Sequence, residues 1–387
     1  MIGIMSDNEY KVLDLILKNS KMSQVELSKN IGISKAAISK IVNKLKEQNI
    51  VSEILVNEIK KKGRPKQYLV INKLDKKIIG INFGKDYFEI SLGNIKGELL
   101  KTRLKKFFLK KSMSIVNILL EELTLFLEEV KDFEIIGVGI CINAIVDSKK
   151  GIIINHPYFR WENLNLVEII ESRYKIPVVI DNNVRSILKA EIHFTQLKKY
   201  KDILYIYIND GIYSSIMINN KILVGKNMHS GQIAHYKPVN TDNKSCECGK
   251  RGCINSMYSE NSILLKLEEE YDKYNKKLEI NNMYDLYEKI SKKSEIAKKI
   301  ISDISIEVGQ VVGNILNILD IENIIIAGDI TYSGDIFLDG FNKGIKENYI
   351  NDIAKIEYSK LGKNIEKKAA FNLVIENVFD KLKLFKE

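Results

Sequence analysis

Apolar residues recur at helical spacing in three short segments near the N-terminal end of the chain, and this pattern predicts three helices. The apolar face of the first consists of Tyr10, Val12, Leu13, Ile16 and Leu17. In the second, Ser23 and Glu26 have the spacing of a capping box, and Gly32 can end the helix. Ser34 can cap the third, whose apolar face is Ile38, Ile41, Val42 and Leu45. The short interval between the last two predicts a helix-turn-helix.

The polar face of the third helix carries small and cationic side chains, which suit entry into a DNA major groove. These are Ser34, Lys35, Ala36, Ser39, Lys40 and Asn43, with Ser23 at the start of the second helix as a further candidate contact. Strands are predicted over 50–56 and 67–71, joined by a loop that contains Lys61, Lys62, Gly63, Arg64 and Pro65. In such a wing, an extended Arg can enter a narrow minor groove while Lys contacts phosphates. Residues 1–73 are therefore predicted to form a winged helix-turn-helix domain.

From about residue 77 the pattern changes to strands that alternate with helices. Strands are predicted over 78–83, 87–92, 135–142, 177–180, 203–208, 214–218 and 324–327. Helices are predicted over 116–130, 166–173, 184–193, 301–319 and 366–385, and the charged segment 264–293 is also predicted to be helical. This alternation predicts an α/β protein, not a helical bundle or an all-β sandwich.

The charge of the chain is unevenly distributed. The 387 residues carry a net charge of +10, and +7 of it falls within residues 1–73. A separate basic module indicates an anionic partner, for which double-stranded DNA is the usual candidate. The alternative is a three-helix interaction module with a solvated lysine loop. No stretch approaches the roughly 20 apolar residues of a membrane span, and the N-terminus lacks the layout of a secretion signal; a cytoplasmic protein with no membrane partner is expected.

Three of the four cysteines lie close together, as Cys246, Cys248 and Cys253, with His235 eleven residues upstream of the first. One nitrogen and three sulfurs make a tetrahedral set for Zn²⁺, and with all four positions taken by protein the metal would be structural. The alternative is a disulfide with a spare thiol, which a cytoplasmic chain disfavours. The fourth cysteine, Cys141, lies in an apolar strand and is interpreted as a small hydrophobic residue. His156, His193 and His229 have no comparable spacing and are interpreted as ordinary surface or core residues.

The cysteine motif and several other segments resemble those of a known protein family. The run 231–235 followed by Cys-x-Cys-Gly-x-x-Gly-Cys over 246–253 resembles the zinc signature of the ROK family, which groups bacterial sugar-responsive repressors with sugar kinases. Segments 137–147, 177–191 and 324–328, and the wing end 63–65, also resemble the family. The resemblance implies two actin/hexokinase-like (ribonuclease H-like) lobes around a sugar cleft, and a homodimer or dimer of dimers. The lobes are expected over 74–190 and 191–365, with a helix over 366–387 returning to the first.

The resemblance also implies where catalytic residues would stand. Kinases of the family carry Asn-Asp-x-Asn ahead of a Glu, and this chain has Asn182-Asn183-Val184-Arg185 ahead of Glu191. The expected general base is thus Asn183, an amide that cannot take a proton from a sugar hydroxyl. Asp181 lies one residue away and is expected to point elsewhere. No catalytic residue is predicted.

The three phosphate-binding loops of the family are altered as well. The first reads Asn82-Phe83-Gly84-Lys85-Asp86, without the family's acidic residue and with one glycine fewer. The second, 209–215, places Tyr213 and Asp210 where glycines are expected, and the third, 327–329, has lost one of a glycine pair. A bulky ring blocks the backbone approach to a phosphate and a carboxylate repels it, so no ATP is expected.

The sugar pocket that the resemblance implies keeps polar groups but loses its carboxylates. The expected contacts are Asn182, Asn183, Gln232, His235 and Asn255. Amides still donate and accept hydrogen bonds but carry no charge. Trp161 and Tyr158 can stack on a sugar ring, and core packing is an equal alternative for either.

These observations favour a DNA-binding transcriptional repressor of carbohydrate genes, whose kinase-like body senses a carbohydrate effector and lacks kinase activity. The first alternative is an ATP-dependent sugar kinase fused to a DNA-binding domain. The second is a zinc-sensing regulator, which would need a weak, exchangeable metal.

Overall fold

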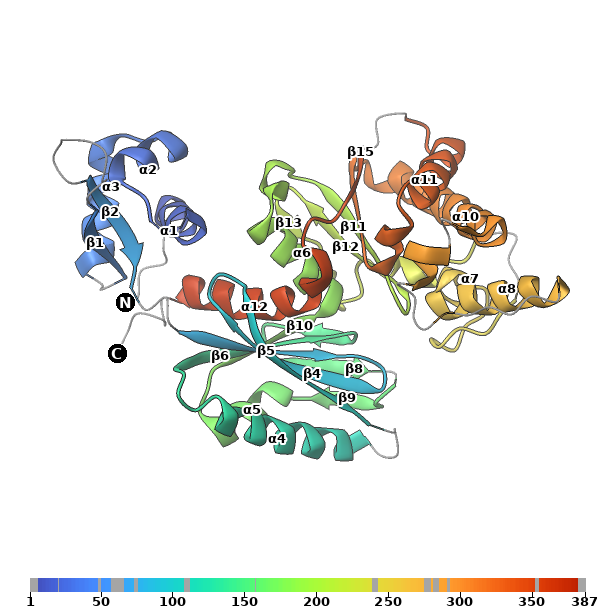
Figure 1. The fold of residues 1–387 in the computed structure, drawn as a ribbon, viewed down its shortest axis with the longest axis horizontal. Helices are drawn as coiled ribbons and strands as arrows, with labels where there is room; N and C mark the ends of the chain where they lie inside the picture. Colours follow the sequence, from blue (N-terminus) through green and yellow to red (C-terminus); the bar gives the residue numbers. More distant parts are fainter. Residues whose placement is uncertain are drawn as a thin grey trace.

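The computed structural model describes residues 6–381 apart from 20, 48–49, 57–65, 73–75, 108–111, 157, 239–242, 275–279, 281–284, 291–292 and 352–354. The chain forms an N-terminal domain followed by two α/β lobes (Figure 1). The α/β class predicted from the sequence is confirmed. None of the described helices has the length and apolar content that a membrane span requires.

The N-terminal domain is a winged helix. Its helices are α1 (Asp7–Asn19), α2 (Gln24–Ile31) and α3 (Lys35–Glu47), followed by the antiparallel strands β1 (Val51–Val56) and β2 (Lys66–Ile71). The capping box of Ser23 and Glu26 is present, and Gly32 ends α2 in the left-handed region at φ +77°. The helix-turn-helix prediction is confirmed. The predicted wing contacts Lys61, Lys62, Gly63, Arg64 and Pro65 lie outside the described residues.

The first lobe is built on a five-stranded sheet in the order β10-β6-β3-β4-β5. These strands are β3 (Lys77–Phe83), β4 (Tyr87–Asn94), β5 (Leu99–Lys106), β6 (Ile135–Ile142) and β10 (Val178–Asn182). Helices α4 (Ser112–Glu129) and α5 (Leu166–Tyr174) share one apolar core with the sheet. A small sheet of β7 (Ile145–Asp147), β8 (Ile152–His156) and β9 (Trp161–Leu164) extends the lobe.

The second lobe has its own five-stranded sheet, in the order β13-β12-β11-β14-β15. The strands are β11 (Ile203–Ile208), β12 (Ile212–Ile218), β13 (Lys221–Ile222), β14 (Asn323–Ala327) and β15 (Lys355–Tyr358). One face packs against α7 (Ile254–Tyr258), α8 (Glu260–Lys273), α10 (Glu295–Leu319) and α11 (Asp335–Asn348).

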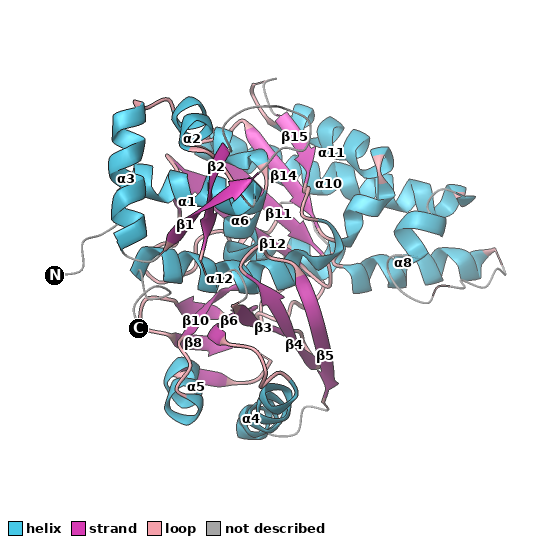
Figure 2. Cartoon of the chain, turned by 60° about the vertical axis from the view of Figure 1, so that its left-hand side comes forward, coloured by secondary structure: helices cyan, strands magenta, loops and turns pink. Residues whose placement is uncertain are grey.

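Two helices lie between the sheets of the two lobes (Figure 2). They are α6 (Asn183–Phe194) and α12 (Ile365–Lys381). One buried cluster joins Ile187 and Leu188 of α6 and Ala369 of α12 to Tyr205 of β11. On its other side α12 lies so close to β3 and β6 that only glycines fit beneath it. Side chains at Gly80 or Gly139 would meet Ala370.

The winged helix shares a core with the first lobe. Val12, Leu13 and Ile16 of α1 belong to the same buried cluster as Phe371 and Val374 of α12. An ion pair joins the domain to the body as well, because Lys198 Nζ lies 2.8 Å from Asp14 Oδ2. Helix α12 therefore contributes to the buried cluster shared with the DNA-binding domain and to the cluster between the lobes.

Several elements differ from the sequence-based expectation. Strand β5 was not predicted, because it reads Leu-Leu-Lys-Thr-Arg-Leu-Lys-Lys and lacks an apolar face. It is an edge strand whose Lys101, Arg103 and Lys105 pair with glutamates of α4. Strands β7–β9, β13 and β15 and helix α11 were also not predicted. In the segment 264–293, α8 ends at Lys273, and residues 285–290 form a π-helix.

We predict that Gly139→Ala destabilises the chain more than Gly137→Ala. A methyl group at 139 would overlap the carbonyl oxygen of Ala370, which is backbone and cannot rotate away. At 137 it would lie 2.7 Å from Cγ1 of Val374, a side chain that can adjust. Overpacking of this kind costs about 1–3 kcal/mol, or more where backbone must move. Urea unfolding of the two variants checks this, and equal midpoints would contradict the close packing of α12.

Candidate effector site, metal cluster and DNA-binding surface

A cavity of about 540 Å³ lies between the two lobes. The first lobe contributes the segment after β6, part of β8 and the start of α6, and the second contributes β12, the loop before His235 and the cysteine motif. The lining residues are Asn143, Ala144, Ile145, Asn155, Tyr158, Asn182, Tyr213, His229, Gln232, Ala234, His235, Glu247, Cys248, Lys250 and Asn255. Its deep walls carry amides and apolar groups, and charges occur only at Glu247 and Lys250, which are exposed.

Four of the five predicted effector contacts meet at this cavity: Asn182, Gln232, His235 and Asn255. The fifth, Asn183, is 4% exposed and does not line it. Its Nδ2 atom instead lies 3.5 Å from Oε1 of Glu366. Asn183, which follows β10, therefore contacts Glu366 of α12 and does not line the cavity.

The lining amides differ in what they can still bind. Asn182 caps α6 by accepting from the backbone N–H of Arg185, and it donates to the carbonyl of Ala144 at 3.0 Å. Asn255 accepts from the backbone N–H of Ile212 at 2.8 Å, which leaves its amide nitrogen for a ligand. The Gln232 side chain makes no hydrogen bond within the described part of the chain. Asn182 thus shapes the wall, and Gln232 and Asn255 retain free hydrogen-bonding groups.

Sequence reasoning missed three polar residues of the cavity, Asn143, Asn155 and His229. Asn155 lies on β8 and His229 in a loop of the other lobe, so no local pattern connects them. Tyr158, considered before as a stacking residue, lines the cavity, and its buried hydroxyl has no partner among the described residues. An unpaired buried hydroxyl is costly and indicates a missing polar partner. Trp161 is 2% exposed and packs against Phe83 and Phe159, which makes it a core residue.

The other two histidines are buried. His156 stacks on Phe159 and accepts from its backbone N–H at 3.1 Å. Burial lowers the pKa of His156 to about 4, so it is neutral at ordinary pH. His193 lies near the end of α6 beside Phe194.

The position of the expected general base holds a closed polar cluster. Tyr207 Oη donates to Oε1 of Glu366 at 2.9 Å, and Asn82 donates to the Glu366 carbonyl at 3.0 Å. Desolvation raises the pKa of Glu366, although the hydrogen bonds from Tyr207 and Asn183 counteract it. The Oδ1 atoms of Asn82 and Asn183 are buried without a partner in the described chain. The position of the expected general base is thus an amide that contacts Glu366.

Charged and aromatic side chains contact one another at the two segments that correspond to the first and second phosphate-binding loops of the family. Lys85 of the first loop lies 3.0 Å from Glu247 and 3.9 Å from Asp210 of the second lobe. Its ammonium also stands over the Tyr158 ring, 5.2 Å from the centroid. Tyr213 donates to Asp210 at 3.1 Å. The two loops thus bridge the lobes through an ion pair.

A smaller cavity of about 240 Å³ adjoins the third loop, between Gly328, Asp329 and Glu366. A side chain at Gly328, which has φ +96°, would overlap the backbone of Ile208. Nearby, burial and the charges of Asp329 and Asp210 raise the pKa of Glu260 to about 9. Asp329 and Glu366 line this smaller cavity together with Lys367, whose Nζ pairs with Glu89 Oε2 at 2.8 Å.

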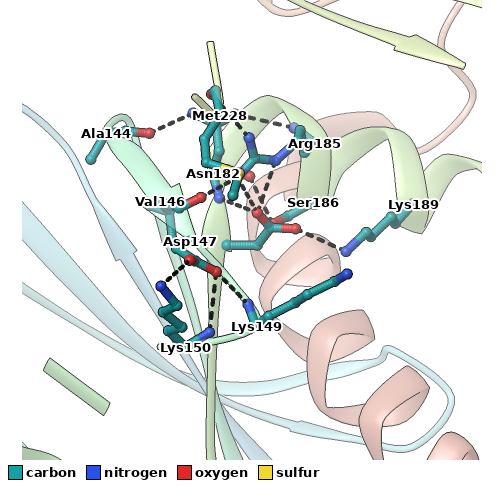
Figure 3. A network of polar contacts seen from close by, with 11 residues as sticks. Ala144, Val146, Asp147, Lys149, Lys150, Asn182, Arg185, Ser186, Lys189 and Met228 are labelled. Atoms are coloured by element: carbon teal, nitrogen blue, oxygen red, sulfur yellow. Dashed lines mark hydrogen bonds and ion pairs between the residues drawn. The ribbon is translucent and has the colours of Figure 1, made fainter. Parts of the chain in front are cut away.

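Asp181 does not line the cavity and forms ion pairs with two cations, Arg185 and Lys189, both of which are labelled in Figure 3. Arg185 Nη2 and Lys189 Nζ lie 2.6 Å and 2.8 Å from its two carboxylate oxygens. Burial alone would raise the pKa of Asp181, but Lys189 and Arg185 hold it below its ordinary value.

The four predicted metal ligands come together. The ligand atoms of His235, Cys246, Cys248 and Cys253 all lie within 4.8 Å of one another. The Cys248 and Cys253 sulfurs are 3.7 Å apart, as are Cys246 Sγ and His235 Nδ1. A tetrahedron with metal–sulfur bonds of about 2.3 Å has edges of about 3.8 Å. The cluster can therefore hold a metal ion, whereas Cys141 is buried in β6 and takes no part.

The predicted DNA contacts of α3 lie on one exposed side of the winged helix. Ser34, Lys35, Ala36, Lys40 and Asn43 are exposed, and Ser39 is half-buried. Ser34 Oγ accepts from the backbone N–H of Ala37 at 3.2 Å and so caps α3. Ser23 is engaged in the capping box of α2. Leu27, Ile38 and Val42 are buried beneath them.

A winged helix-turn-helix joined to two α/β lobes with a cleft of this kind defines a class of protein: a DNA-binding domain on a sugar-kinase-like body. Comparison with known proteins agrees with this division. Residues 5–52 match a winged helix-turn-helix DNA-binding family, and residues 78–371 match the ROK family. The chain belongs to the ROK family.

Individual proteins resemble the chain over most of its length. The xylose repressor of Caldicellulosiruptor bescii is 27% identical over 368 residues, 92% of each chain. A crystal structure of a ROK family transcriptional regulator, a homologue of the Escherichia coli MLC protein, superimposes with a TM-score of 0.81, 22% identity and 97% coverage of both chains. A ROK family glucokinase from Streptomyces griseus gives 0.66 and 19% identity, covering 77% of this chain and 98% of its own. These two structures show that the fold is shared.

Proposed function

We propose that this chain is a transcriptional repressor whose sugar-kinase-like body binds a small carbohydrate without phosphorylating it. The observation that carries the proposal is the cavity between the lobes. It retains free amide and hydroxyl groups, including the unpaired hydroxyl of Tyr158, while Asn183 occupies the position of the general base. The site keeps the means to bind hydroxyl groups and lacks the group that would activate one.

The absence of phosphoryl transfer follows from the former phosphate loops. Lys85 is committed to an ion pair with Glu247 of the other lobe. Asp329 and Glu366 line the cavity at the third loop, and Lys367, the one cation among the lining residues, is paired with Glu89. Phosphoryl transfer depends on positioning and on cationic stabilisation of the phosphates, and this arrangement supplies the opposite charge.

The effector class follows from the cavity lining. Asn143, Asn155, Gln232 and Asn255 are neutral hydrogen-bonding groups, and Lys250 is the one lysine or arginine among the lining residues, beside the acidic Glu247. The effector is therefore an uncharged sugar. The resemblance to the xylose repressor of Caldicellulosiruptor bescii makes a pentose the first compound to test.

The signal would pass from the cavity to DNA through α12. Glu366, at its first turn, contacts Tyr207 of the second lobe, and further along Phe371 and Val374 belong to the buried cluster that includes Val12, Leu13 and Ile16 of the winged helix. An effector that favours one closure angle of the lobes would shift α12 and change the spacing of the two winged helices in a homodimer. The size of the effect equals the difference in effector affinity between the two states.

For the cysteine cluster we propose structural Zn²⁺, held by His235, Cys246, Cys248 and Cys253. Four protein ligands with tetrahedral spacing leave no open position for chemistry. Because His235 and Cys248 also line the cavity, the metal would fix one wall of the effector site. Tight binding distinguishes this structural role from that of a zinc sensor.

We predict that a neutral sugar weakens DNA binding by this chain. DNA fragments selected by the full-length protein from a random pool would be titrated with and without D-xylose and a panel of neutral pentoses and hexoses. We expect at least one sugar to raise the Kd for DNA by about 5- to 150-fold, the usual range of allosteric coupling. Unchanged affinity across the panel would leave a constitutive DNA binder.

A parallel assay of phosphoryl transfer from ATP to the same sugars tests the kinase alternative. We expect no turnover above a no-enzyme control. Turnover that is abolished by Asn183→Ala would overturn our assignment of this position.

Removing the charge of Lys35 is predicted to weaken DNA binding. Lys35 is exposed at the first turn of α3. If it contacts a phosphate, Lys35→Ala lowers the slope of log K against log salt by about one, and if it reads a base it changes the selected sequence. Lys343→Ala, an equally exposed lysine on α11, is the matched control. Equal effects of the two variants would place DNA recognition elsewhere.

The purified chain is predicted to contain about one zinc ion per chain, resistant to moderate chelators, as expected for a closed four-ligand site. Elemental analysis by mass spectrometry measures it. Cys253→Ser should lose most of the metal and lower the unfolding temperature, because the knuckle around it then has no cross-link. Cys141→Ser, which lies outside the cluster, should retain the metal; a loss there would show that the signal is not specific.

A further inference from the structure

The loop that carries His229 into the cavity has an uncommon backbone. It runs from Gly225 to Gly231, and both glycines as well as Met228 have positive φ, with Met228 at +62°. A non-glycine residue in the left-handed region costs about 1–2 kcal/mol and persists only where its surroundings hold it. Within the loop, only turn-like hydrogen bonds hold Met228, such as the one from its N–H to the Gly225 carbonyl at 3.3 Å.

One side chain from the other lobe reaches this loop. Nη1 of Arg185, on α6, lies 3.5 Å from the Met228 carbonyl oxygen, next to His229. Nη2 of the same guanidinium donates to the Val146 carbonyl at 2.9 Å, next to the lining segment 143–145. Figure 3 shows Arg185 with Val146 and Met228. Arg185 thus contacts the backbone next to lining residues of both lobes, at Val146 beside Ile145 and at Met228 beside His229, while it does not line the cavity itself.

The guanidinium is suited to this role because it is held in place. Nε and Nη2 donate to Oδ1 of Asp181 at 2.9 Å and 2.6 Å, and the side chains of Arg185 and Asp181 are 6% and 2% exposed. A planar group with five donors can pair with a carboxylate on one edge and still donate to two carbonyls. Backbone carbonyls carry no charge, so the positive charge is balanced by Asp181 and not by the loop.

Lys189 offers an internal comparison. It pairs with the other carboxylate oxygen of Asp181 at 2.8 Å, but no contact joins it to Val146 or Met228 in the described chain. If either cation is removed, Asp181 keeps the other, which avoids the large cost of a buried unpaired charge. Replacement of Arg185 removes the donor to the Val146 and Met228 carbonyls, whereas replacement of Lys189 leaves that donor in place.

We infer that Arg185 is a positioning residue of the effector site: it sets the loop 225–231 against the first lobe, so that His229 and Gln232 face the ligand. This inference rests on the proposed function. Arg185 occupies the fourth position of the segment 182–185, where the kinases that the chain resembles carry Asn. Because its contact to Met228 crosses between the lobes and is the longest that it makes, opening of the lobes breaks that contact first.

The first test needs no ligand. Full-length Arg185→Met and Lys189→Met chains are compared with the parent by amide hydrogen exchange. Loss of hydrogen bonds to a charged donor predicts exchange across 224–232 that is about tenfold faster in Arg185→Met, with little change in Lys189→Met. Equal exchange in this segment for both variants would overturn the inference.

A conservative variant guards against misfolding. Arg185→Lys keeps the charge beside Asp181 but cannot donate to both carbonyls, so exchange across 224–232 should still rise while the rest of the lobe remains protected. If Arg185→Lys exchanges like the parent, the charge and not the bridging geometry is what matters, and the positioning role is wrong.

The second test uses D-xylose and the same sugar panel with selected DNA. Both variants should bind DNA without sugar like the parent, and Arg185→Met should need about tenfold more sugar for release while Lys189→Met responds normally. A normal sugar response in Arg185→Met would overturn the inference. No sugar response in the parent chain would overturn the proposed function instead, and the exchange experiment then decides the role of Arg185 by itself.

Discussion

The close packing of α12 between the two sheets is the constraint on which the rest of the structure depends. Gly80 and Gly139 let the helix backbone approach β3 and β6, and Ala370 occupies the contact. Residues of α12 belong both to the buried cluster between the lobes and to the cluster that contains Val12, Leu13 and Ile16 of the winged helix. The helix therefore takes part in the packing of the cleft and in the core shared with the DNA-binding domain.

The cleft shows how a kinase-like site can lose catalysis and keep binding. The base position holds an amide whose donor is directed at Glu366. The first phosphate loop supplies Lys85, which now joins the lobes by pairing with Glu247. The amides that line the cavity are uncharged. They avoid the desolvation cost that carboxylates would have at these positions without a cationic partner. Charged side chains of this body form the lobe contact between Lys85 and Glu247 and the Asp181 cluster, and Asp329, Glu366 and Lys367 line the smaller cavity at the third loop.

Local sequence signals predicted what depends on neighbouring residues. The capping box of Ser23, the left-handed Gly32 and the buried face of α3 follow from spacings of a few residues, and the metal cluster follows from three cysteines within eight residues. Strand β5 could not be predicted in this way, because its alternation is hidden by lysines that pair with α4 only after folding. Asn143, Asn155 and His229 were not predicted either, because the lining residues of the two lobes meet only across the cleft.

The sequence by itself therefore determined the winged helix, the α/β alternation, the family and the loss of the catalytic base, because each is encoded in short motifs or in the identity of one residue. Only the tertiary structure decided which polar groups face the effector. In the folded chain Asn183 contacts Glu366 and does not line the cavity, and the Asn182 side chain caps α6. Arg185 contacts backbone carbonyls of both lobes. Such roles depend on which side of a helix faces the cleft and on contacts between residues more than 30 positions apart, and no local pattern carries that information.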